Sequence, residues 1–197
     1  PHPDGFVYFT DITTTVGQVE KEFGRLWRYD RDSGVTERFL AHAGQPNGMA
    51  VDGAGNLVVA QAADWGGRRI VRIDPETMKT TLVAGLYDGA PLNAPNDVAV
   101  DAAGRLYFTD PRYLGHESIE QDAFGVYRVD PDGTVTRIID DLQGPNGIAL
   151  HPDGRTLYVT EYDVGFHSLA PYAGGQPRPD RGAMQLLAWD LDDTASV

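Results

Sequence analysis

The stretch APNDVAVDAAGRLYFTDP, residues 94–111, decides the fold. It reads as an Asx-type turn at Pro95–Asp97, followed by a short apolar strand at Val98–Val100. A tight turn at Asp101–Gly104 then leads into a second strand at Leu106–Thr109. The stretch therefore predicts two adjacent antiparallel strands.

The same phrase recurs along the chain. It occurs earlier as QPNGMAVDGAGNLVVAQ (residues 45–61), later as GPNGIALHPDGRTLYVTE (residues 144–161), and in truncated form as PHPDGFVYFTD (residues 1–11). The glycines that mark the copies are 50, 49 and 50 residues apart, at Gly5, Gly55, Gly104 and Gly154. This spacing is typical of propeller and solenoid repeats.

Each complete repeat contains four short β-rich runs separated by Gly, Asp, Asn and Pro. The runs are Met49–Val51, Asn56–Ala60, Arg69–Asp74 and Thr80–Ala84, and then Val98–Val100, Leu106–Thr109, Val126–Asp130 and Val135–Ile139. Arg alternates with apolar residues in the third run of each repeat, which predicts a strand packed on one face and more solvent-exposed on the other. Four-stranded antiparallel units at this period predict an all-β protein, a β-propeller.

The repeat count predicts an incomplete ring. The first repeat begins at the turn before its second strand, and the fourth ends at Val197, where its last strand is expected. We therefore expect residues 1–197 to form a single propeller domain, incomplete at both ends, with about four blades of a six-bladed ring. On this interpretation the chain is part of a longer protein.

Composition narrows the possible partners. The 197 residues carry a formal net charge of −13, which argues against nucleic acid or an anionic membrane surface. No apolar run approaches the roughly 20 residues of a membrane span, and no secretory signal is recognisable. The absence of cysteine leaves the redox compartment open. The location is unknown; a cytoplasmic one is favoured, and a periplasmic or secreted one stays possible. The oligomeric state is also open.

Asn47, Asn96 and Asn146 occupy the same phase of three successive repeats, just ahead of the innermost strand. Equivalent residues of neighbouring blades converge near a propeller axis, and amide oxygens are hard donors that Ca²⁺ accepts. The alternative is that each Asn only forms an Asx turn, which a repeat would copy without any ligand. Neutral amides alone also make a poor site for a divalent cation unless carboxylates join them.

Two carboxylates are candidates for catalysis. Asp97 adjoins one amide, although its side chain should point away from that of Asn96, which favours a supporting role. Asp110 ends a second strand, in phase with Asp11 and Glu161, and begins the long connection 112–124. That connection and residues 162–183 are interpreted either as surface insertions or as a lid, which makes His116 a candidate substrate-binding residue and His167 a residue of interest.

The phrases QPNGMAVDGAGNLVV, APNDVAVDAAGRLYFTDPRY and GPNGIALHPDGRTLYVTE, with the opening HPDGFVYFTDI, resemble the gluconolactonase/regucalcin family over most of the chain. The resemblance implies a six-bladed propeller with one divalent cation in its channel. It implies that Asn96 and Asn146 are metal ligands and that Asn47 is a pocket residue. The family's Glu and Asp ligands would lie outside this chain, which is then expected to be inactive by itself.

The leading hypothesis is a metal-dependent lactone hydrolase that opens a small sugar lactone, with Ca²⁺ as the cation and Zn²⁺ as the alternative. Asn96 and Asn146 would bind the metal, Asn47 and His116 would contact substrate, and Asp97 and Asp110 would be the catalytic carboxylates. One alternative is a phosphotriesterase that uses the same fold, as in diisopropyl fluorophosphatase. Another is a non-catalytic NHL-like propeller that binds a partner.

Overall fold

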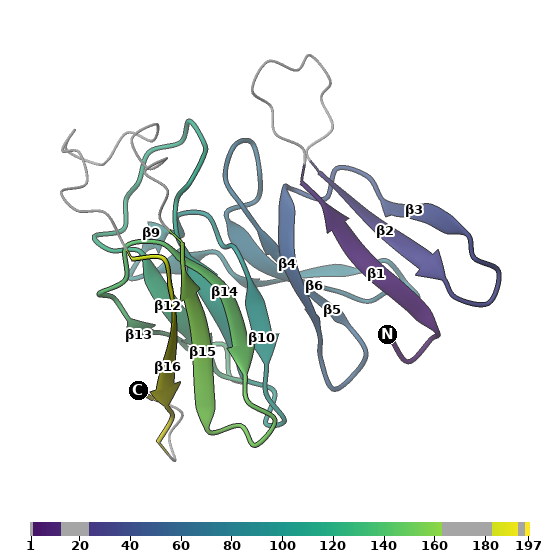
Figure 1. Ribbon diagram of the computed structural model, residues 1–197. Coiled ribbons are helices and arrows are strands. Elements are labelled where there is room, and N and C mark those ends of the chain that lie inside the picture. Colours follow the sequence, from purple (N-terminus) through teal and green to yellow (C-terminus); the bar gives the residue numbers. More distant parts are fainter. Residues whose placement is uncertain (1, 13–23, 163–182, 193–195) are drawn as a thin grey trace.

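A computed structural model describes residues 2–12, 24–162, 183–192 and 196–197. Four antiparallel sheets follow one another along the chain, and the strands of each sheet pair in sequence order (Figure 1). The first and last sheets have three strands each, β1 (Phe6–Asp11), β2 (Arg25–Asp30) and β3 (Thr36–Leu40), and β14 (Pro145–Leu150), β15 (Thr156–Glu161) and β16 (Gln185–Asp190).

The two middle sheets have four strands each. They are β4 (Pro46–Val51), β5 (Leu57–Gln61), β6 (Arg69–Ile73) and β7 (Thr80–Ala84), and β10 (Val98–Val100), β11 (Leu106–Asp110), β12 (Gly125–Val129) and β13 (Val135–Ile139). All eight strands predicted for these two repeats are present. A short hairpin of β8 (Leu86–Tyr87) and β9 (Ala90–Pro91) was not predicted.

In the described part of the chain, no helix is long and apolar enough to cross a membrane.

The repeated turn between the first two strands depends on an aspartate and a glycine. Asp101 Oδ1 accepts hydrogen bonds of 2.9 Å from the backbone N–H groups of Ala103 and Arg105, and Asp52 does the same in the second repeat. Gly104 has a φ of 82°, which falls in the left-handed region that side chains other than glycine rarely adopt. The periodic glycines thus mark a backbone requirement of the turn.

The core lies between the sheets. One cluster joins the second and third sheets, through residues that include Val58, Ala60, Ile70, Leu106, Phe108 and Tyr127. A second joins the third and fourth sheets, and a third joins the first and second, where Leu57 and Val59 contribute from the opposite face of β5. Successive residues of one strand therefore enter different clusters, as expected when blades pack face to face.

The prediction that third strands are packed on one face only was wrong for β6 and β12. In β12, Val126 packs against the fourth sheet while Tyr127 packs against the second. Ile70 and Val71 of β6 divide in the same way between two clusters. The arginines of these strands lie toward the strand ends, so they do not define a solvent-exposed face.

First strands of neighbouring blades lie against each other, since β10 contacts both β4 and β14 (Figure 1). β4 also contacts β1, which is the second strand of its repeat. Gly48 of β4 sits directly against the third blade, because a Cβ at this position would overlap the Asp97 side chain and lie 2.5 Å from its Cα. A side chain is therefore excluded at the seam between these blades.

Gly48→Ala is expected to destabilise the protein by about 1–3 kcal/mol through overpacking at this seam. Gly53→Ala is the matched control, since a Cβ at Gly53 would meet nothing within 4 Å. Chemical denaturation of both variants measures the difference. Equal unfolding midpoints for Gly48→Ala and Gly53→Ala would contradict the packing described here.

Candidate metal and substrate site

Asn47 and Asn146 lie in β-bulges. Pro46 pairs with Gln61 and Met49 with Val59, so Asn47 and Gly48 together face a single residue of β5. The pairing of β14 with β15 has the same irregularity around Asn146 and Gly147. The Asn residues were expected in turns ahead of the strands, but the bulges place these two within β4 and β14. A bulge bends the strand and redirects its side chains, and such features are common next to active sites.

Asn96 has an equivalent position ahead of β10. Its backbone N–H donates to the Thr109 carbonyl oxygen at 2.8 Å, and the Thr109 N–H donates to the Asp97 carbonyl oxygen at 3.1 Å. Thr109 of β11 therefore pairs with both Asn96 and Asp97. Two residues ahead of β10 thus lie opposite one residue of β11, as in the bulges of the other two blades. The PNG and PND phrases thus encode the same local geometry in three blades.

Hydrogen bonds between blades connect the three Asn positions. The Gly48 N–H donates to the Asn96 carbonyl oxygen at 2.7 Å, which joins the second blade to the third. The Thr109 hydroxyl donates to the Asn146 carbonyl oxygen at 2.5 Å, which joins the third blade to the fourth. The backbone carrying Asn47, Asn96 and Asn146 is therefore held by direct bonds from each blade to the next.

Asp97 strengthens the second of these junctions. Its Oδ1 accepts a hydrogen bond from its own neighbour, the Val98 N–H, at 2.9 Å, and its Oδ2 accepts one from the Ile148 N–H at 3.0 Å. Both carboxylate oxygens are engaged by backbone donors of β10 and β14. This arrangement positions the strands that carry Asn96 and Asn146.

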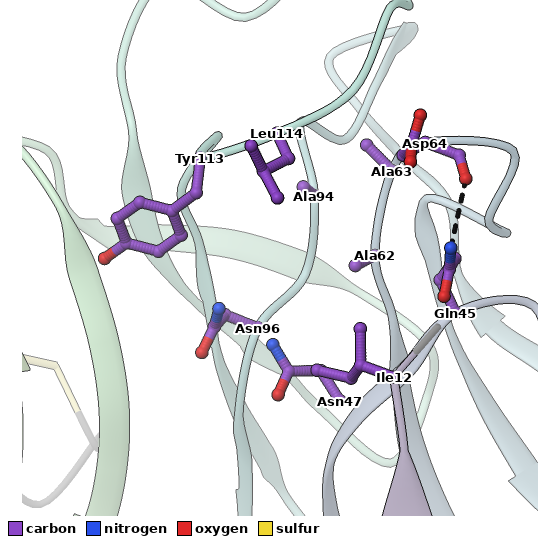
Figure 2. A pocket seen from close by; sticks show the side chains of 10 residues that line it. All are labelled: Ile12, Gln45, Asn47, Ala62, Ala63, Asp64, Ala94, Asn96, Tyr113 and Leu114. Carbon is purple, nitrogen blue, oxygen red and sulfur yellow. Dashed lines mark hydrogen bonds between the residues drawn. The ribbon is translucent and has the colours of Figure 1, made fainter. Parts of the chain in front are cut away.

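A pocket of about 120 Å³ lies at this end of the second and third blades (Figure 2). The Asn47 and Asn96 side chains lie next to each other on one side of it, and Tyr113 and Leu114 lie across from them. The remaining lining residues are Ile12, Gln45, Ala62, Ala63, Asp64 and Ala94. Asn146 is not among the lining residues, so the structure brings two of the three amides to this pocket and joins the third to them through the backbone.

The three Asn side chains share one further property. None of their amide groups forms a hydrogen bond with another residue in the described ranges. An amide oxygen left without an internal donor is available to a ligand, and it is a hard, neutral oxygen of the kind that binds Ca²⁺. The described residues contain no group of three or more His, Asp or Glu side chains placed to hold a metal ion. The amides therefore suit the neutral part of a cation's coordination shell.

The polar residues that end β5, β11 and β15 have a shared structural task. Asp110 accepts hydrogen bonds from the backbone N–H groups of Asn93 at 2.7 Å and Ala94 at 2.8 Å, two residues before Asn96. Glu161 accepts one from the Gln143 N–H at 2.7 Å, shortly before Asn146. Gln61 performs the equivalent task with its amide, which donates to the Ala43 carbonyl oxygen at 2.7 Å. Each residue thus fixes the segment that leads into the next Asn.

Asp110 is completely buried. Burial raises the pKa of its carboxyl to about 7, although the Asn93 and Ala94 N–H groups and the positive charge of Arg112 act in the opposite direction. The catalytic roles expected of Asp97 and Asp110 stay predictions. The contacts seen for both carboxylates are with backbone donors.

Sequence reasoning did not identify Arg112 as a residue of this region. Its guanidinium is buried and donates to the Asn93 carbonyl oxygen, through Nε at 3.1 Å and Nη2 at 2.7 Å, and to the Glu117 carbonyl oxygen at 2.7 Å. It thereby ties the 112–124 connection to the segment that precedes Asn96. A single Arg at the start of a loop carries no pattern that would have revealed this role.

Glu117 joins the same connection to the second blade. Its carboxylate accepts hydrogen bonds from the backbone N–H groups of Asp64 at 3.0 Å and Trp65 at 2.9 Å. These two residues have φ values of 63° and 66°, a conformation that typically costs about 1–3 kcal/mol per residue and needs such support. The 112–124 connection therefore packs across the neighbouring blade.

His116 lies on the outer side of this contact. Its imidazole packs against the indole of Trp65, with ring centroids 4.2 Å apart, and its Nδ1 is 3.6 Å from a carboxylate oxygen of Asp64. Asp64 lines the pocket whereas His116 does not. Substrate binding by His116 stays a prediction. His167 and most of the 162–183 connection lie outside the described residues.

Comparison with known proteins decides the family. Residues 3–175 match the family described as SMP-30/gluconolactonase/LRE-like region. The chain belongs to this family. The chain is similar to a gluconolactonase from Zymomonas mobilis, which is 40% identical over 122 residues that cover 59% of this chain and 33% of that protein. Lactonase drp35 from Staphylococcus saprophyticus is 33% identical over 134 residues, covering 66% of this chain and 39% of that protein.

A solved structure of a gluconolactonase from Xanthomonas campestris superimposes with a TM-score of 0.71 at 29% identity. The superposition covers 87% of this chain and 52% of that one. The present member of the SMP-30/gluconolactonase/LRE-like family therefore spans about half of this structure and about a third of the Zymomonas protein.

The raised pKa of Asp110 predicts a pH dependence of stability. Because the carboxyl holds its proton more tightly in the folded state, its contribution is complete below pH 4 and is lost as the pH rises toward 7. The loss should be roughly 1.4 kcal/mol per pH unit in this window, with no further loss above it. Asp110→Asn should remove this component from the free energy of unfolding measured by denaturation at pH 4 to 8. If the unfolding free energies of the wild-type protein and Asp110→Asn change with pH in the same way, the raised pKa assigned to Asp110 would be contradicted.

Proposed function

We propose that this chain forms the cation-binding and substrate-facing part of a metal-dependent lactone hydrolase, within a propeller completed by further blades. The proposal is supported chiefly by one observation: the side-chain amides of Asn47 and Asn96 face a pocket without internal hydrogen-bond partners among the described residues, and bonds between blades connect them to Asn146. Family membership and the gluconolactonase relatives support the same reaction class.

Asn96 and Asn146 would hold the cation through their amide oxygens, with Ca²⁺ preferred because both of these donors are hard oxygens. Zn²⁺ is the alternative. A divalent cation in such a site supplies electrophilic polarisation of the ester carbonyl and lowers the pKa of water. The negatively charged ligands that such a cation also requires would come from other parts of the full-length protein.

Asn47 would orient the substrate. Its amide can donate to an ester oxygen at the place where the ring opens, since it lies beside Asn96 in the pocket (Figure 2). In the overall reaction the water oxygen bonds to the carbonyl carbon and the ring C–O bond breaks. One water proton ends on the released alkoxide oxygen, and the product is a hydroxy acid.

Asp97 and Asp110 would act as positioning residues. Asp97 holds the third and fourth blades together next to the two metal-binding amides, and Asp110 fixes the segment before Asn96. Burial keeps Asp110 away from the pocket. His116 would influence substrate through its contacts with Asp64, Trp65 and Glu117.

Asn96→Ala and Asn146→Ala in the full-length protein are each expected to weaken cation binding and to abolish cation-dependent lactone opening. Loss of a direct ligand should exceed the roughly 10–100-fold effect typical of residues that only support one. Calorimetric titration with Ca²⁺ and a lactonase assay measure both effects. Asn56→Ala is the control, because Asn56 belongs to the turn formed with Asp52. Full activity in both Asn variants would refute the assignment, and failure of the wild-type protein to bind a cation would favour a non-catalytic binding module.

Asp97→Asn separates positioning from proton transfer. In this variant an amide nitrogen replaces the Asp97 oxygen that accepts the hydrogen bond from the Ile148 N–H, so this bond between blades is lost. The free energy of unfolding should fall by about 1–3 kcal/mol, and activity should fall with it. The pH profile of kcat/KM should keep its shape. Disappearance of the acidic limb of that profile, with stability unchanged, would instead make Asp97 the general base.

A further inference from the structure

The pocket beside Asn47 and Asn96 has walls whose polar groups are largely occupied. The Tyr113 hydroxyl lies 2.9 Å from the carbonyl oxygens of both Gly144 and Tyr162, so its hydrogen is used by the backbone. The Gln45 side chain donates to the Asp64 carbonyl oxygen at 3.3 Å (Figure 2). Tyr113 therefore presents mainly its ring to the pocket.

Apart from Asp64, the other wall residues are aliphatic. Ala63 and Ala94 are 4% and 6% exposed, whereas Leu114 and Ile12 are 38% and 46% exposed and both line this pocket. Figure 2 shows Leu114 on the side opposite the two Asn residues, near Ala63 and Ala94. Two accessible aliphatic side chains in one small pocket form a surface suited to apolar groups.

The position of Leu114 is fixed by the loop that carries it. Gly115 lies against the second blade, where an added Cβ would be 2.9 Å from the Ala63 Cβ and 3.0 Å from the Asp64 nitrogen. The Arg112 and Glu117 contacts hold the two sides of this loop. Leu114 is thus built into the pocket by contacts on both sides of it in the sequence.

Five of the described lining residues carry polar side chains: Gln45, Asn47, Asp64, Asn96 and Tyr113. Of these, the Asn47 and Asn96 amides form no hydrogen bond with another residue in the described ranges. A sugar lactone placed with its carbonyl at the amides would press several hydroxyl groups against Leu114, Ala63 and Tyr113. Burying a hydroxyl without a hydrogen-bond partner is unfavourable, while an alkyl or aryl group at the same place would be favourable.

We propose that the preferred substrate is a lactone whose ring carries an apolar substituent, and that Leu114 is the specificity-determining residue that contacts this substituent. The inference rests on the lactone hydrolase proposed above and departs from the sugar lactone expected from the sequence. The two amides receive the ester end, and the apolar wall receives the alkyl or aryl group.

The test compares δ-decalactone with δ-gluconolactone, which share a six-membered ring but carry a pentyl group and hydroxyl groups, respectively. The full-length protein with Ca²⁺ should hydrolyse δ-decalactone with a kcat/KM at least about tenfold higher. Leu114→Asn should lower this ratio about tenfold, chiefly by reducing kcat/KM for δ-decalactone. Leu82→Asn is the matched control, because Leu82 is 61% exposed on the outer strand β7. A preference for δ-gluconolactone, or equal ratios in the wild-type protein and Leu114→Asn, would overturn the proposal.

A binding experiment separates this inference from the hydrolase proposal. The corresponding lactams, with a ring N–H in place of the ring oxygen, resist hydrolysis and can be titrated calorimetrically. Tighter binding of the pentyl lactam supports the apolar subsite, provided that Leu114→Asn weakens this binding and Leu82→Asn does not. This conclusion holds even if neither lactone is hydrolysed, because the absence of hydrolysis would refute only the hydrolase proposal. Equal or weaker binding of the pentyl lactam, or no binding of either lactam, contradicts the subsite.

Discussion

The hydrogen bonds that join each first strand to the next blade are the constraint on which the site depends. Apolar packing between blades is strong but non-directional, so by itself it would allow neighbouring sheets to slide. The bond from the Gly48 N–H to Asn96 and the bond from the Thr109 hydroxyl to Asn146 fix the register. The Asp97 carboxylate adds a second bond at the latter junction. Because these bonds involve the backbone of the Asn residues themselves, the amides are positioned by the fold's own connections.

The carboxylates and amides of this region have separate tasks. Asp97, Asp110 and Glu161 accept hydrogen bonds from backbone N–H groups and so hold strands and connecting segments in place. The Asn amides make no such bonds within the described residues and remain available to ligands. In the described part of the chain these three carboxylates thus hold the backbone around the candidate site, while the Asn amides keep their hydrogen-bonding groups unused. A cation would have to obtain its balancing charge from elsewhere in the full-length protein.

Much of the architecture could be predicted from the sequence, because strand runs and turn residues repeat at a fixed spacing. The Asp and Gly of each turn after the first strand are local signals, and the apolar runs of β5 and β11 are long enough to indicate strands buried on both faces. The bulges could not be predicted, since they are defined by pairing with another strand. The wrong prediction for β6 and β12 has a similar origin: Arg near the end of a strand resembles alternation, but only the neighbouring blade shows which faces are covered.

The candidate site was predictable in part. The shared phase of Asn47, Asn96 and Asn146 identified the amides, but not their bonds across blades. The Arg112 and Glu117 contacts and the pocket face of Leu114 depend on how one loop packs on another. The most direct test of the account is a crystal structure of the full-length protein soaked in Ca²⁺, with an anomalous difference map. A calcium peak about 2.3–2.6 Å from the side-chain oxygens of Asn96 and Asn146 is predicted. A cation bound elsewhere, with these amides turned away from the channel, would contradict it.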